Sequence, residues 1–137
     1  MTADDFDRLV ERVWARIPGR FRRRLANIAV VVEREPSPAQ LATAGVRNGT
    51  LLGLYQGRPL TGRSVFENFT LPDRITIFQG PHERLARSEA ELERLVEETV
   101  WHEVAHYFGM DERRVRAAEG RRRAAVRRAS GTRGPRS

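Results

Sequence analysis

Two histidines and a glutamate are the residues of this sequence best placed to do chemistry together. His102 and His106 are four positions apart, and Glu103 directly follows the first. Residues four apart lie above one another on a helix, so both imidazoles can bind one metal ion. The carboxylate beside that line can act as a general base toward a water molecule at the ion. Because the chain has no cysteine, any ligands of this predicted metal site must be His, Asp or Glu.

A long helix must position these three residues. Ser88 and Glu91 form a capping-box pattern that opens it, and Gly109 is expected to stop it after Phe108. At about 100° per residue, the two histidines and the glutamate project onto the helix face that carries the apolar residues Leu92, Leu95, Val96 and Val100. Buried there, each ionisable group would be costly unless satisfied, and a metal ion would satisfy them. The alternative is a pair of structural histidines that meet this spacing by chance.

The remaining elements are predicted from periodicity and from turn residues. The pattern indicates helices over residues 6–17 and 38–46, a buried strand over 27–33, further strands over 51–56 and 74–79, and a loop over 57–64. Ser37 and Gln40 are expected to cap the second helix. His82 follows Gly80-Pro81 and is predicted to be an ordinary loop residue.

The formal charge of +7 lies entirely in the C-terminal tail. Residues 120–137 hold seven of the 25 arginines and none of the 18 acids, so residues 1–119 carry 18 arginines against 18 acids. We predict one domain over 1–119 and an arginine-rich, disordered tail over 120–137. Nucleic acid is expected as a partner only through that tail. The acidic start and the short apolar runs predict a cytoplasmic protein with no membrane partner.

Beyond the three site residues, several stretches of the chain resemble a known family. The sequence His102-Glu103-Val104-Ala105-His106-Tyr107-Phe108-Gly109-Met110-Asp111-Glu112 is similar to the His-Glu-x-x-His-x-x-Gly-x-x-Asp motif of the Asp-zincins. More closely, residues 5–119 resemble the small bacterial mini-zincins. Besides the helix, the resemblance rests on residues 29–33, 52–61 and 71–78.

The resemblance implies an α+β fold of the minimal zincin type, with a small mixed sheet packed on the active-site helix. It also implies that His102 and His106 bind Zn²⁺, that Glu103 is the catalytic acid–base, and that Gly109 turns the chain so that a third ligand returns. Where the Asp-zincin motif has Asp, this chain has Glu112. We therefore expect Glu112 as the third ligand, with Asp111 as the alternative.

The favoured function is a zinc-dependent metallopeptidase that acts on a peptide or protein substrate, with residues 74–79 as the edge strand that pairs with it. A catalytically weak or inactive zincin-like module for metal binding or protein interaction is the alternative. Tyr55, Tyr107 and several arginines are candidates for stabilising the oxyanion.

Overall fold

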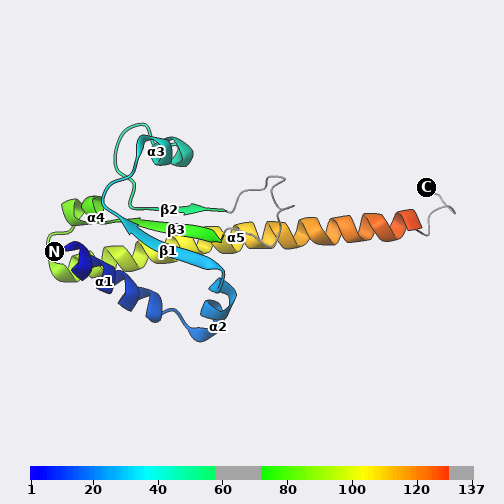
Figure 1. Cartoon of the computed structure of the whole chain (residues 1–137), viewed down its shortest axis with the longest axis horizontal. Helices are drawn as coiled ribbons and strands as arrows, with labels where there is room; N and C mark the ends of the chain where they lie inside the picture. The colour runs from blue at the N-terminus through cyan, green and yellow to red at the C-terminus, as the bar shows by residue number, and fades with distance from the viewer. Residues whose placement is uncertain (58–71, 130–137) are drawn as a thin grey trace.

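The fold is α+β, as the sequence predicts, with helices packed on a small mixed sheet (Figure 1). The computed structural model describes residues 1–57 and 72–129. In chain order the elements are α1 (Ala3–Ala15), α2 (Gly19–Arg22), the 3-10 helix η1 (Arg23–Leu25), β1 (Ile28–Glu33), α3 (Pro38–Ala44), β2 (Gly53–Gln56), β3 (Asp73–Phe78), α4 (Gln79–Leu85) and α5 (Glu89–Ala129). Most of the predicted loop over 57–64 lies outside the described residues.

The sheet has the strand order β1-β3-β2. β3 pairs in parallel with β1 and antiparallel with β2, and it is buried apart from Arg74. The prediction of residues 74–79 as an edge strand is therefore wrong: β3 is central. The prediction of a buried first strand is also wrong. β1 lies at the edge of the sheet opposite β2, and all six of its residues are only half-buried.

The core lies between the sheet and two helices, α1 and α5. The helices α1 and α5 contact each other, and α5 also contacts β2 and β3. The fully buried members of this core include Phe6, Leu9, Ile75, Ile77, Val96 and Val100. Apolar residues at helical spacing on α1 and α5 and at every second position on β3 explain why these elements pack together.

Side-chain caps fix where α1, α3 and α5 begin. The Ser37 and Gln40 capping box forms as predicted, and α3 ends at Gly45 in the left-handed conformation, with φ 74°. At α5, the Glu91 backbone N–H donates to Ser88 Oγ at 3.1 Å. The Glu91 carboxylate accepts from the Arg87 backbone N–H instead of closing the box on Ser88.

Helix α5 is far longer than predicted. It does not end after Phe108 but continues through Gly109 to Ala129, 41 residues in all, and projects beyond the strands (Figure 1). Residues 120–129 of the predicted disordered tail are thus helical, and residues 130–137 lie outside the described residues. No described helix is long and apolar enough to cross a membrane.

Candidate metal centre

Helix α5 brings His102, Glu103 and His106 together at the level of the sheet. One possible ligand atom of each residue lies within 4.8 Å of those of the other two. The two imidazole rings lie one turn apart, with their centroids separated by 4.5 Å. The structure therefore assembles the group that the four-residue spacing predicts.

The histidines lie at the rim of the buried face and not on it. Both are exposed, the His106 side chain by 56 %, whereas the Glu103 side chain is only 6 % exposed. The buried face of α5 at this level runs through Val100, Glu103 and Tyr107, about one residue step around the axis from the histidines. The prediction that the two histidines face the core is thus wrong. An ion bound by them would be open to solvent.

Glu103 is buried against the edge strand β2, next to Gly53. Its Oε1 lies 3.3 Å from His106 Nδ1. A Cβ at Gly53 would lie 3.3 Å from Glu103 Cγ and 2.6 Å from Thr99 Cγ2, so only glycine lets the strand approach α5 this closely. Gly53 is not among the site residues predicted from the sequence, although a glycine within a strand pattern signals a close backbone approach.

The opposite flank of α5 is held by α2. The Phe21 ring lies edge-on to Trp101, with centroids 6.0 Å apart, and it also contacts the Phe108 ring at 6.0 Å. These aromatic contacts lie on the side of α5 that faces away from Glu103, where Phe108 is half-buried and Trp101 stays partly exposed. Of the residues that the structure describes, neither the α2 aromatic ring nor β2 buries the two histidines, which stay exposed.

These three side chains fit a zinc ion in their chemistry. The two imidazoles, one helical turn apart, supply nitrogen ligands of the type that zinc prefers when cysteine is absent, and the Glu103 carboxylate lies beside them. Among the described residues, no other His, Asp or Glu joins this group.

Glu112 and Asp111 lie elsewhere. Glu112 is ten residues beyond His102 on an unbroken helix, which places it about 80° away around the axis. Its nearest charged partner is Arg116 at 3.8 Å, and its side chain is 66 % exposed. The predicted turn at Gly109 is wrong, so the prediction of Glu112 as a ligand has lost the turn on which it depended. Asp111 is 3.5 Å from Arg24 and caps no following helix, since α5 continues.

The two tyrosines proposed for the oxyanion have other partners. The Tyr55 hydroxyl donates to Asp73 Oδ2 at 2.6 Å, and burial together with this carboxylate raises the pKa of Tyr55 to about 12. Arg114 of α5 donates to the same carboxylate at 3.0 Å and to the Tyr55 hydroxyl at 3.1 Å. The Tyr107 hydroxyl donates to the Arg24 carbonyl at 3.2 Å. Both tyrosines therefore help to fix α5 in place.

His82 is not a loop residue. It lies in α4 and is fully buried, with Nδ1 at 2.7 Å from the Phe78 carbonyl and Nε2 at 2.9 Å from Thr99 Oγ1. Because a carbonyl only accepts, Nδ1 carries the proton and donates. Burial lowers the pKa of His82. The residue thus ties α4 to α5 one turn before Glu103.

Comparison with known proteins gives one family match and one similar solved structure. The model of a zincin-like metallopeptidase family matches residues 25–122, which include α5 up to and beyond the histidines. The chain is also similar to the solved structure of a conserved hypothetical protein from Thermus thermophilus, with 30 % sequence identity and a TM-score of 0.60, over 82 % of this chain and 99 % of that one. A search of curated proteins gave no significant match. Since the family model spans most of the sequence, this chain belongs to the zincin-like metallopeptidase family.

Proposed function

We propose that the protein is a zinc-dependent peptidase in which His102 and His106 hold the ion and Glu103 is the general base. The observation that carries the proposal is the grouping of these three side chains within 4.8 Å on a helix that packs beside an edge strand. When bound, zinc would supply a positive charge that polarises the scissile carbonyl and acidifies the attacking water.

The surroundings of Glu103 support its proposed role as general base. Its side chain is buried against Gly53 while its carboxylate oxygen lies at the histidine level. This burial holds the carboxylate in one orientation, so it can accept a proton from the attacking water and return it to the leaving amine. A carboxylate on the exposed side of α5 would sample many orientations.

The edge of β2 is the proposed docking position for an extended substrate. β2 replaces the segment 74–79 in this role, because β3 already pairs on both sides. In the described part of the chain, β2 pairs only with β3, and Gly53 places its backbone next to Glu103. A peptide that pairs with β2 would therefore pass directly over the site.

A second candidate is a metal-binding interaction module without catalysis. It is favoured by the exposure of both histidines and by the engagement of Tyr55 and Tyr107 elsewhere. Both features leave less of the described chain to enclose a substrate or stabilise an oxyanion.

The test combines metal analysis with cleavage of a broad peptide library. We expect one zinc per chain in the wild type, no stoichiometric zinc in His102→Ala or His106→Ala, and retained zinc without cleavage in Glu103→Gln, since the amide keeps the shape and cannot accept the proton. Glu98→Gln is the matched control, because this exposed glutamate lies on the same helix outside the metal group.

Each result has a defined meaning. Zinc binding without cleavage by the wild type would select the interaction module. Cleavage that persists undiminished in Glu103→Gln would exclude Glu103 as the base, and a wild type unable to take up zinc would reject both functions.

A further inference from the structure

The projecting end of α5 carries most of the excess charge of the protein. Residues 115–129 contain six arginines and one glutamate, whereas residues 1–114 are balanced at 17 arginines and 17 acids. We call residues 115–129 the basic segment. Its described arginines are Arg116, Arg121, Arg122, Arg123 and Arg127, of which all are exposed.

The basic segment gains little stability from the fold. After Tyr107, no residue of α5 whose side chain is described is buried, and Val115 and Val126 are 51 % and 62 % exposed. Gly120 lies within it, and Arg123 and Arg127 are like charges four residues apart, which both oppose helix formation. An anionic ligand would remove this repulsion and stabilise the helix.

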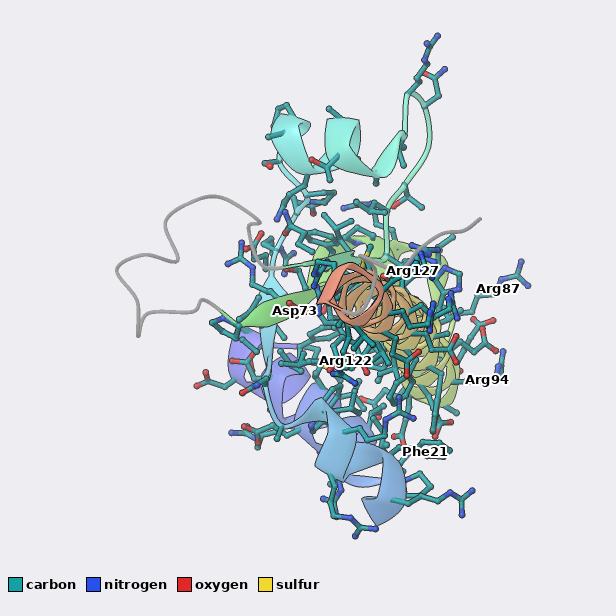
Figure 2. All side chains as sticks on the ribbon, turned by 90° about the vertical axis from the view of Figure 1, so that its right-hand side faces the viewer. Phe21, Asp73, Arg87, Arg94, Arg122 and Arg127 are labelled. Carbon is teal, nitrogen blue, oxygen red and sulfur yellow. The ribbon has the colours of Figure 1, made fainter. Side chains whose placement is uncertain are left out.

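The arginines surround much of the helix instead of lining one face. At about 100° per residue, Arg121, Arg122 and Arg123 span about 200° of the circumference, and Arg127 extends this to about 240°. In Figure 2, which looks along α5, the labelled Arg122 and Arg127 lie on different sides of it. A flat protein surface would contact only part of this distribution, whereas a groove with two charged walls would contact most of it.

We propose that the basic segment binds the major groove of duplex DNA through its phosphates, without base specificity. The groove is about 12 Å wide and admits one α-helix with phosphates on both walls. The 15 residues rise about 22 Å, which corresponds to about six to seven base pairs. Guanidinium groups match phosphate in geometry. A membrane surface fits less well, because the segment lacks the large apolar residues of an interfacial helix.

The test is fluorescence anisotropy of a labelled 20-base-pair duplex of arbitrary sequence with the full-length protein between 50 and 200 mM NaCl. Four neutralised phosphate contacts predict a slope of log K against log salt of about −3.6. The variant Arg121→Gln, Arg122→Gln, Arg123→Gln, Arg127→Gln should bind at least about tenfold more weakly and lose most of this slope. Helicity measured by circular dichroism should rise when the wild type binds.

The matched control removes the same charge from the folded body. Arg12, Arg47, Arg87 and Arg94 are exposed and lie outside the basic segment. Their combined change to Gln should alter DNA affinity less than about threefold. Equal weakening by both quadruple variants would overturn the proposal, as would undetectable DNA binding by the wild type.

Two further probes decide the partner class. Single-stranded DNA bound as tightly as duplex would overturn the groove, and polyglutamate or anionic lipid vesicles that compete as well as DNA would overturn nucleic acid as the ligand. Zinc content measured on the same samples separates this result from the proposed peptidase, because the quadruple variants leave the metal group intact.

Discussion

Gly53 is the residue on which the spacing between β2 and α5 depends. Gly53→Ala would place a Cβ 2.6 Å from Thr99 Cγ2, a contact that buried atoms cannot accept without movement. We expect a loss of about 1–3 kcal/mol in the free energy of unfolding. Urea denaturation measures the loss, and a parallel zinc titration reports whether Glu103 and the histidines have shifted. A variant as stable as the wild type would show that β2 is not held this closely.

His82 should make stability depend on pH. Burial lowers the pKa of His82 in the folded state. Above about pH 6.5, the ordinary histidine pKa, the His82 side chain is neutral in both the folded and the unfolded state, so its contribution to stability does not change with pH. As the pH falls below that value, the unfolded chain takes up a proton that the folded chain resists. The free energy of unfolding therefore decreases, by up to about 1.4 kcal/mol per pH unit.

The chain offers a clean way to measure this effect. It has three histidines, so the variant His102→Ala, His106→Ala leaves His82 as the only one. In that variant we expect the melting temperature to fall from pH 7 to pH 5, and adding His82→Gln should flatten the dependence. A flat profile before His82 is changed would contradict the assignment of a buried neutral imidazole.

At the scale of elements, the continuation of α5 through Gly109 determines whether Glu112 can reach the metal group. A Cβ at Gly109 would meet no atom within 4 Å, and alanine favours the helix interior. Gly109→Ala should therefore raise the free energy of unfolding by about 0.5–1 kcal/mol and leave zinc affinity unchanged. Glu112→Ala should also leave it unchanged. Loss of zinc affinity in both variants would instead establish a bend at Gly109 and Glu112 as the third ligand.

The sequence predicts where the helices and strands begin better than it predicts which strands pair with each other. Capping residues at Ser37 and Ser88 are local signals, and both are confirmed. The order of the strands is not a local property: β1 and β3 pair across about 40 intervening residues, and periodicity alone does not reveal which strand is central. Hence residues 74–79 were expected at an edge and are found in the middle.

Similar reasoning explains the two largest errors on the helices. Gly109 is a common helix-stop residue, but glycine costs only about 1 kcal/mol in a helix, and the residues on both sides of it favour helix. The sequence gives no sign of the partners of His82, because they are the backbone carbonyl of Phe78 and the hydroxyl of Thr99. Neither group forms a recognisable pattern with a histidine in the sequence. The metal group was predictable because its three members lie within five consecutive residues on one helix.

At the scale of the whole molecule, the far end of α5 should be dispensable for folding. Its described side chains beyond residue 107 are not buried. We expect deletion of residues 120–137 to change the melting temperature by less than about 1 °C and to leave zinc content unchanged, as measured by differential scanning calorimetry and metal analysis. A drop of several degrees would show that this part of the helix stabilises the folded body.

The continuity of α5 also sets the geometry between the metal group and the basic segment. From His106 to Arg122 the helix advances about 24 Å, and each residue adds about 100° of rotation. A flexible linker of equal length would let the basic segment take any direction relative to the metal group, whereas the helix holds the two in one relative orientation. A macromolecule bound at the distal end of α5 would therefore lie at a fixed distance and in a fixed direction from His102 and His106. Only a molecule attached to it at that distance and in that direction could reach the two histidines, so binding at the distal end would by itself select among substrates.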